Sequence, residues 1–386
     1  MADPNVGRAR PDELEAINEL ATTAFRVNNP NHPSFDLLYP HGYREETFPA
    51  EDHLVIRDGG RPVAMVALRP LRFAVGPNMI DVAGIGDVCT HRDYRGRGYM
   101  TVLMKVAEAE IDDRGFVLGF LGGERARYGR FGWEQAGCYW TFGLTEKYLA
   151  EIDLSDWTIE EPETIEPWMH AAIEEKPFRR SMAFDEMIWA VKRIGRRNLT
   201  AQGPGGRAVV VYDHATDETD QARSVTIDEW GGSPDAILAL GTELARRKDV
   251  ADVSLTTPAV GDGLTRLLRA RAWSYGPRTA ANVRVCRLAE LLMAYFPWMS
   301  RCPNVCPGGI TLRMTDVDQA ATLVLDDAPS IVDAPGQFEV ALNRLDMTTF
   351  LFGPLPPSRV FDLPHELAAL DAIFPLPIFA SSISGV

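Results

Sequence analysis

The sequence predicts a chain of the α+β class, built from three consecutive units that each combine strands with helices. Three observations support this. The length of 386 residues corresponds to two or three domains of ordinary size. Apolar residues make up 46% of the chain, which is enough for several cores and excludes general disorder. Strand-like and helix-like patterns alternate along the whole chain, without short repeats or low-complexity segments.

The first unit is predicted to be a mixed sheet with helices. Pro11–Phe25 carries apolar residues at the spacing of one helical face. Two strand hairpins follow, with turns at Asp58–Gly60 and Gly76–Asn78. Tyr99–Arg114 gathers its apolar residues on one face and is the clearest helix of the sequence. The short apolar run Phe116–Leu121 predicts a buried strand.

The second and third units are predicted from weaker patterns. Expected strands of the second unit are Ala208–Tyr212, Ser224–Trp230 and Val253–Leu255. Its expected helices are Phe184–Arg193, Asp235–Lys248 and Gly263–Ala272. The third unit has expected strands at Ile310–Met314, Ala320–Val324, Phe338–Leu342 and Thr348–Phe352, with helices at Leu288–Tyr295 and His365–Ile373. We expect the apolar C-terminal tail, FPLPIFASSISGV, to dock on the protein.

Charge and hydropathy exclude several kinds of partner. The net charge of −15 argues against a surface that binds nucleic-acid phosphates, and an acidic field favours cationic small molecules. No run of eighteen apolar residues occurs, and the first residues, MADPNVGRARPDELE, show no apolar signal-peptide core. We therefore expect a cytoplasmic protein with neither a nucleic-acid nor a membrane partner.

Common catalytic and metal-binding motifs are missing from the sequence. The five cysteines are irregularly spaced, and Cys302 and Cys306 in CPNVC lack a second Cys/His pair nearby, so we expect no metal. The sequence contains no HExxH, GxSxG, GxxxxGK[ST] or GxGxxG pattern. Zinc-peptidase, serine-hydrolase, P-loop and dinucleotide-binding functions are therefore not indicated.

Residues 84–133 carry the chemical signal of the sequence. A predicted strand ends at Thr90, and an arginine- and glycine-rich turn leads directly into the predicted helix. Unpaired N–H groups at a helix N-terminus favour an anion, and glycines such as Gly96 and Gly98 allow close backbone approach. Arg95 and Arg97 add positive charge suited to a diphosphate. The alternative is a surface turn that happens to hold two arginines.

Two motifs in this stretch resemble a known superfamily. Arg95–Met100, RGRGYM, resembles the R/Q-x-x-G-x-G/A pyrophosphate loop of the GCN5-related N-acetyltransferases (GNATs). ERARYGRFGW at 124–133 is similar to the matching segment of the enhanced-intracellular-survival (Eis) acetyltransferases, in which an aliphatic residue also tends to occupy the position of Met100. Only residues 84–133 match tightly, although length and order of units agree throughout.

The resemblance implies a domain organisation. We expect an N-terminal GNAT domain at 1–149, which binds acetyl-CoA and is catalytic, and a degenerate second GNAT-like domain at 150–281. Each would hold a mixed, splayed β-sheet flanked by helices. An α+β domain like a sterol carrier protein would follow at 282–386, with its tail reaching the active site. The resemblance also implies a homohexamer.

The resemblance further implies which residues bind acetyl-CoA, the expected cosubstrate. Val88, Cys89 and Thr90 would pair their backbone with the pantetheine arm. The pyrophosphate turn would be formed by Arg95, Gly96, Arg97, Gly98, Tyr99, Met100 and Thr101. Gly123 and Glu124 would approach the cosubstrate after the next strand.

Tyr128 matches the general acid of the family, because a phenol with a pKa of about 10 stays protonated and can protonate a departing thiolate. The alternative is that Tyr128 only packs beside Phe131 and Trp133. The family's base is the C-terminal α-carboxylate, here that of Val386. The chain ends SISGV, whereas the family usually ends in Phe, so a tail that only fills a groove is the alternative, and Glu124 is a second candidate base.

The implied reaction is direct transfer of acetyl to a primary amine of a cationic acceptor, such as an aminoglycoside, a polyamine or a lysine side chain. No covalent enzyme intermediate is expected, and Cys89 is taken as a structural strand residue. Arg26 would repel an amine and receives no role. Two alternatives belong to other classes: an acyl-CoA sensor without catalysis, and a carrier of apolar ligands that uses the third domain.

Overall fold

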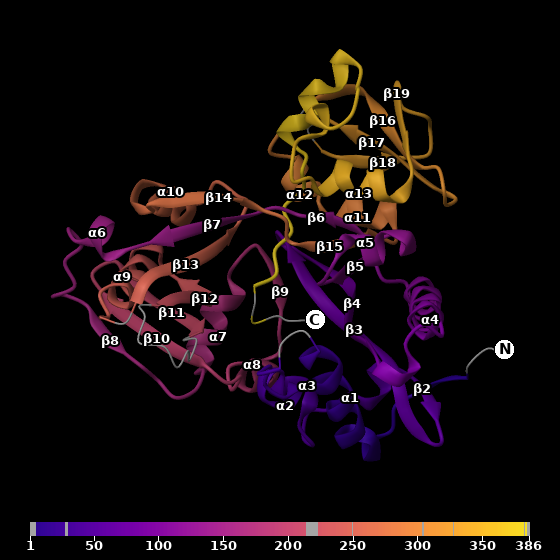
Figure 1. Cartoon of the computed structure of the whole chain (residues 1–386). Helices are drawn as coiled ribbons and strands as arrows, with labels where there is room; N and C mark the ends of the chain where they lie inside the picture. Colours follow the sequence, from indigo (N-terminus) through magenta and orange to yellow (C-terminus); the bar gives the residue numbers. More distant parts are fainter. Residues whose placement is uncertain are drawn as a thin grey trace.

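The computed structural model describes residues 5–27, 30–213, 223–248, 250–302, 305–326, 328–381 and 383. These residues form three β-sheets with helices packed on each, which confirms the mixed α+β class. Two larger sheets lie side by side, and the smaller C-terminal domain sits against the first of them (Figure 1).

The first sheet contains eight strands of the described chain, in the order β1-β2-β3-β4-β5-β15-β6, with β9 paired to the end of β3. Their bounds are β1 Val6–Arg8, β2 His53–Asp58, β3 Arg61–Val75, β4 Asn78–Thr90, β5 Leu118–Leu121, β6 Glu134–Ala136, β9 Phe178–Ser181 and β15 Ala281–Val285. The helices of this domain are α1 Leu14–Arg26, α2 Phe35–Leu38, α3 Pro40–Tyr43, α4 Tyr99–Asp113 and α5 Arg125–Tyr128. Both predicted hairpins and the predicted long helix are confirmed.

The second sheet has the order β14-β7-β13-β12-β11-β10-β8. Its strands are β7 Tyr139–Leu144, β8 Thr158–Glu160, β10 Arg196–Gly203, β11 Gly206–Asp213, β12 Arg223–Gly232, β13 Val250–Pro258 and β14 Ser274–Arg278. Its helices are α6 Glu146–Leu149, α7 Pro167–Glu174, α8 Phe184–Ala190, α9 Pro234–Ala245 and α10 Gly263–Arg271. Strand β10 was not predicted, because its sequence RRNLTAQG has too few apolar residues for a strand pattern.

Three strands are exchanged between the larger sheets, one of them β9, which lies between β8 and β10 in the sequence but pairs with β3. β7 follows β6 along the chain but lies in the second sheet, between β13 and β14. β15 comes from the far end of the second domain and lies in the first sheet, between β5 and β6 (Figure 1). The sheets therefore do not follow the division expected at residues 149/150 and 281/282, since strand pairing at this distance leaves no local signal in the sequence.

The C-terminal domain contains a four-stranded sheet in the order β18-β17-β16-β19. The strands are β16 Cys306–Met314, β17 Gln319–Leu325, β18 Ser330–Val332 and β19 Phe338–Leu342. The helices are α11 Leu288–Ala294, α12 Phe296–Met299 and α13 Arg344–Phe352, and a 3₁₀ helix spans His365–Ala372.

One predicted element of this domain is wrong in type. Thr348–Phe352 was expected as a strand and instead forms the last turns of α13. A short apolar run does not distinguish a buried strand from a buried helix. The deciding signal lies upstream, where the Asn343 side chain accepts a hydrogen bond from the Asp346 N–H and caps the helix.

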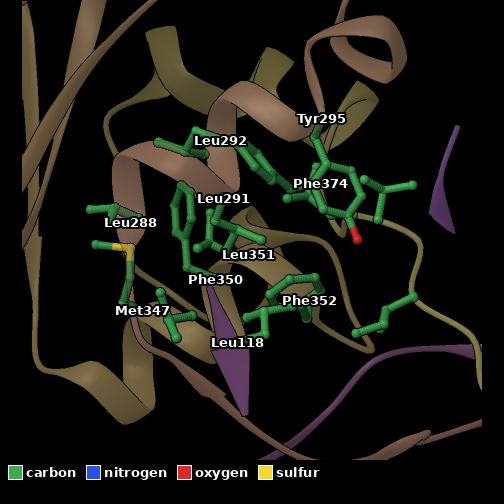
Figure 2. Close-up of a cluster of buried hydrophobic side chains, with 14 of the residues drawn as sticks. Leu118, Leu288, Leu291, Leu292, Tyr295, Met347, Phe350, Leu351, Phe352 and Phe374 are labelled. Carbon is green, nitrogen blue, oxygen red and sulfur yellow. The ribbon is translucent and has the colours of Figure 1, made fainter. Parts of the chain in front are cut away.

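The C-terminal domain shares its core with the first sheet. One cluster of buried side chains joins β3, β4 and β5 to α11, α13 and the tail. Figure 2 shows Leu118 of β5 lying among side chains of α11 and α13, which include Leu288, Leu291, Met347, Phe350 and Phe352. This face of the first sheet is therefore covered by a domain that is distant in sequence.

No helix within the described ranges is both long and apolar enough to cross a membrane.

Candidate active site

The site is built where two parallel strands of the first sheet separate. β4 and β5 pair from Val82 and Leu118 to Ile85 and Leu121, and β5 then ends. β4 continues to Thr90, paired only with β3. No strand in the described part of the chain pairs with the other edge of this extension. An exposed strand edge can accept an extended, amide-containing ligand as if it were another strand.

A β-bulge bends β4 within this extension. The register with β3 shifts between the pairs Ala67–Gly86 and Met65–Cys89, so β4 carries one extra residue there. Asp87 in the bulge adopts a φ of 56°, a left-handed conformation that is uncommon for a residue other than glycine. Bulges redirect strand backbone next to functional sites, so the bulge fixes how the edge from Val88 onward is presented.

A buried ionic group holds the bulge in place. The Asp87 carboxylate lies 2.6 Å from Nη2 of Arg69, and both side chains are more than 90% buried. Nε2 of His53 lies 3.9 Å from the same carboxylate. Burial and, to a smaller extent, the Arg69 guanidinium together lower the pKa of His53 to about 4. His53 is therefore neutral, and Arg69 is the cation that compensates Asp87. Sequence reasoning missed these three residues; a lone Asp inside an apolar strand was the available signal.

The turn after β4 has a left-handed backbone at both of its glycines. Gly96 and Gly98 have φ angles of 78° and 81°, and a Cβ at either position would meet no atom within 4 Å. The left-handed backbone, not crowding, therefore requires glycine here. Gly98 is the N-cap of α4 and has no side chain to cap it, so the first N–H groups of this 15-residue helix are left without that cap.

The two arginines of the turn are exposed and are held by neutral partners. Nε of Arg95 donates to the Thr90 carbonyl at 3.4 Å. The Arg97 guanidinium lies over the ring of Tyr94, 4.6 Å from its centroid. Because both guanidinium groups are exposed, both charges can meet an anion. Thr101, in the first turn of α4, accepts a hydrogen bond from Arg130 at 3.2 Å.

Tyr128 lies on the other side of the strand separation. It ends α5, is 5% exposed, and packs in one cluster with Phe131 and Trp133. Burial raises its pKa above the usual value near 10, and the neighbouring Arg127 opposes that shift. Glu124 and Cys89 also act on this pKa, so the phenol lies within electrostatic reach of the β4 edge. Packing in this cluster and acid chemistry are compatible roles for Tyr128.

The segment before Tyr128 is fixed by the exchanged strand. Asn282 of β15 donates from Nδ2 to the Gly123 carbonyl at 2.8 Å and is itself 1% exposed. Gly123 has a φ of 111°, and a Cβ there would lie 3.0 Å from the Tyr128 ring. Asn282 was not predicted as a site residue, because only the strand exchange brings it to this position.

Other predicted residues are placed less favourably for acid–base chemistry. Burial and the nearby Asp87 carboxylate raise the pKa of the Cys89 thiol far above its usual range, so this thiol stays protonated. Glu124 is exposed and lies 3.6 Å from the Arg127 guanidinium. Arg26 donates from Nε to the His32 carbonyl at 2.8 Å and thereby holds a loop. Val386 lies outside the described residues.

Cavities lie beside the turn and also away from it. Cavities of about 360 and 190 Å³ lie between α1 and the turn, and both are bordered by His91. A larger cavity of about 480 Å³ lies between α11 and the end of α4, and none of the predicted site residues borders it. Of the predicted site residues, Arg95 borders the smaller of the two cavities beside the turn and none borders the other, so we take only the smaller cavity as adjoining the site. Within the described ranges, no group of three or more His, Cys, Asp and Glu could hold a metal ion.

Comparison with known proteins identifies the class of the first domain. Residues 5–136 match the model of the GNAT acetyltransferase domain. The N-terminal third of the chain is therefore a GNAT acetyltransferase domain, and the chain is an enzyme of the N-acetyltransferase class. None of the curated proteins matches the sequence.

Solved structures extend the similarity to the whole fold. Eis1 from Mycobacterium abscessus is 18% identical with a TM-score of 0.69, covering 97% of this chain and 98% of that one. A GCN5-related N-acetyltransferase from Anabaena variabilis is 17% identical with a TM-score of 0.71, covering 97% and 100%. A probable N-acyltransferase from Enterococcus faecalis is 14% identical with a TM-score of 0.70, covering 98% and 99%. In its fold the chain is Eis-like.

Proposed function

We propose that the protein is an acetyl-CoA-dependent N-acetyltransferase that transfers acetyl directly to a primary amine of a cationic acceptor. The observation that carries the proposal is the convergence of the free β4 edge, the Arg95–Gly98 turn and Tyr128 at one strand separation. The edge suits the amides of a pantetheine arm, and the turn suits its diphosphate. The net charge of −15 is compatible with a cationic acceptor.

The residues of the candidate site would have separate roles in acetyl transfer. The backbone of Val88–Thr90 holds the thioester and offers N–H groups to the negative charge that develops on its carbonyl oxygen. A neutral amine attacks the carbonyl carbon, so a C–N bond forms and the C–S bond breaks. Tyr128 gives its proton to the leaving sulfur, for which a raised pKa keeps it protonated at neutral pH. Holding both reactants in one site makes the attack effectively unimolecular.

A base must take the proton of the acceptor ammonium, because an alkyl ammonium with a pKa of about 10.4 is almost fully protonated at neutral pH. We propose the α-carboxylate of Val386 for this role. The path of the tail supports this assignment, because the tail enters between the two larger sheets. The other candidate base, Glu124, is exposed and lies beside the Arg127 guanidinium, which favours the carboxylate of Val386 by comparison. Arg95, Gly96, Arg97, Gly98, Tyr99, Met100, Thr101, Gly123 and Glu124 are proposed to contact acetyl-CoA.

The remaining parts of the proposal concern the whole chain. The second domain is proposed as a degenerate GNAT domain, and the third as similar to a sterol carrier protein. A homohexamer is proposed on the Eis-like resemblance. These three proposals rest on similarity of fold and order of units. A cytoplasmic location is proposed because the sequence has no long apolar run and no apolar signal-peptide core.

The test is thiol release from acetyl-CoA, measured with aminoglycosides, polyamines and lysine peptides. We expect release that depends on the amine and a large loss on deletion of Gly385 and Val386. Release that is unchanged by the deletion would exclude the carboxylate as base. Binding of acetyl-CoA without release for any amine would favour the sensor, and binding of an apolar ligand alone would favour the carrier.

A further inference from the structure

The C-terminal segment leaves its own domain and is buried along its path through the molecule. From Phe374 to Ile383, each described residue is buried or half-buried, without helix or strand hydrogen bonds of its own over most of this length. The Leu376 N–H donates to the Leu351 carbonyl at 2.7 Å, and the Tyr295 hydroxyl donates to the Pro377 carbonyl at 2.9 Å. Figure 1 shows the yellow segment descending between the two larger sheets.

The segment then meets a buried ion pair of the second domain. The Ser381 hydroxyl donates to Oε2 of Glu229 at 2.6 Å. Oε1 of the same carboxylate pairs with the ammonium of Lys176, which also donates to the Trp230 carbonyl at 2.5 Å. Ser381, Glu229 and Lys176 are 7%, 3% and 5% exposed. A hydrogen bond to a buried charge is among the stronger polar contacts in a protein, so this contact anchors the segment.

Two residues further on, an apolar side chain completes the anchor. Ile383 is 1% exposed and belongs to a buried cluster formed by α7, α8 and β11. Its neighbours in the cluster include Met169, Met187, Val209 and Val211. Burial of an apolar side chain of this size is favourable, so the cluster holds the segment independently of the Ser381 contact.

The anchoring strand of the second domain repeats the geometry of β4. The parallel pairing of β12 with β13 ends at Ile227 and Leu255. Beyond this point β12 is paired only with β11. A bulge at Asp228 interrupts the β11 register, as the Asp87 bulge interrupts that of β4. The Asp228 carboxylate lies 2.8 Å from Nε of Arg196, as Asp87 pairs with Arg69. Glu229 therefore lies where the first domain presents its Val88 edge.

We propose that the second domain is a receptor for the C-terminal segment of its own chain, and that Glu229 and Ser381 are positioning residues for the last residues of the protein. In the first domain, the strand separation presents its edge to a substrate. In the second domain, Glu229 at the corresponding position holds Ser381, and the adjoining apolar cluster holds Ile383. A run of three further residues reaches at most about 11 Å from Ile383, so the anchor limits where the chain can end. The anchoring of the segment does not depend on the proposed function. Only the catalytic purpose of the last residues rests on it.

The test compares Ser381→Ala with Ser358→Ala. Ser358 also donates its hydroxyl to a carboxylate, that of Asp371, but lies in the C-terminal domain. Native protein is digested with carboxypeptidase, and removal of residues through Ile383 is followed by mass. Because cleavage tracks the opened population, we expect release about tenfold faster for Ser381→Ala and unchanged release for Ser358→Ala. Ser381→Thr, which keeps the hydroxyl, should restore the slow rate.

Turnover measured on the same proteins tests the positioning role. We expect kcat to fall several-fold in Ser381→Ala while the KM for acetyl-CoA stays constant, because the cosubstrate site in the first domain is untouched. A release rate equal to that of the wild type overturns the proposal, as does equal acceleration in Ser358→Ala. If the wild type acetylates no amine, the proposed function fails, and the release rates still decide whether the second domain holds the segment.

Discussion

At the scale of residues, the site depends on a few side chains whose environment sets their chemistry. Tyr128 is kept protonated by burial, and Cys89 is kept as an unreactive thiol by burial and Asp87. Asp87 itself is compensated by Arg69 behind the strand. The sequence motif predicted the positions of Tyr128 and Cys89, whereas the Asp87–Arg69 pair depends on two strands meeting with a bulge between them.

We predict that Tyr128→Phe lowers kcat about a hundredfold, because general acid catalysis typically contributes two to four orders of magnitude. The ring would keep its packing against Phe131 and Trp133, so thermal unfolding and the KM for acetyl-CoA should change little. Steady-state thiol release, with unfolding measured by circular dichroism, checks this. Full turnover in the variant would leave Tyr128 with a packing role only.

His53 gives the folded state a predictable dependence on pH. Its pKa is lowered from about 6.5 to about 4 by burial, so between these values only the unfolded chain binds the proton. The free energy of unfolding therefore falls as the pH drops through this window, by up to about 1.4 kcal/mol per pH unit from this group. Asp52 acts in the opposite direction, because burial raises its pKa to about 6.

The contribution of His53 is separated from that of Asp52 by substitution. We expect His53→Gln to be less stable than the wild type at pH 7.5 but to lose less stability than the wild type between pH 6.5 and 4.5. Urea unfolding at several pH values measures both slopes. Parallel slopes for the two proteins would contradict the assignment of this dependence to His53.

At the scale of elements, local patterns predicted the elements on which the candidate site is built. The strand, the turn and α4 follow one another in the sequence, so periodicity and glycine spacing were sufficient to predict them. α13 was mistaken for a strand because its apolar run is short, and β10 was missed because it is polar. Asn282 and Glu229 contribute through strand pairing and chain path, which are set by contacts 150 or more residues apart and leave no local pattern.

The turn offers a test of backbone geometry. Gly98→Ala would place a side chain at a φ of 81° with no steric contact, so the cost is the strain of the left-handed backbone, about 1 kcal/mol or somewhat more. We expect a several-fold increase in the KM for acetyl-CoA from relaxation of the turn.

Gly261→Ala is the matched control for this substitution. Position 261 is also free of neighbours within 4 Å and has no left-handed φ, so the variant should behave as the wild type. Calorimetric binding of CoA, together with initial rates, distinguishes the two variants. Equal affinity in both would mean that the turn does not contact the diphosphate.

At the scale of the whole molecule, the domains are not separable. β7 and β15 are each inserted between two strands of the other larger sheet, and the C-terminal domain covers one face of the first sheet. The chain therefore folds into three sheets, but the three units predicted from the sequence are not three independently folding segments.

We predict that the fragment 1–149 does not fold, although it contains the whole matched GNAT region. It lacks β15, so β5 and β6 lose the strand that joins them, and β7 loses both of its partners. Unpaired strand edges of this kind promote aggregation. Far-UV circular dichroism and acetyl-CoA binding of the fragment, beside the full chain, provide the test. A soluble fragment that unfolds cooperatively and binds acetyl-CoA would refute it.

The late position of β15 in the sequence also determines how long the first sheet stays incomplete during synthesis. β6 ends at Ala136, but its neighbour β15 begins only at Ala281. The hydrogen bond from Asn282 to the Gly123 carbonyl therefore cannot form until β15 has been made. At elongation rates of 5–20 residues per second, the ribosome needs roughly seven to thirty seconds to make the intervening chain. Throughout that interval the nascent protein carries an incomplete first sheet, so its need for chaperone protection should be greatest before the catalytic domain is finished.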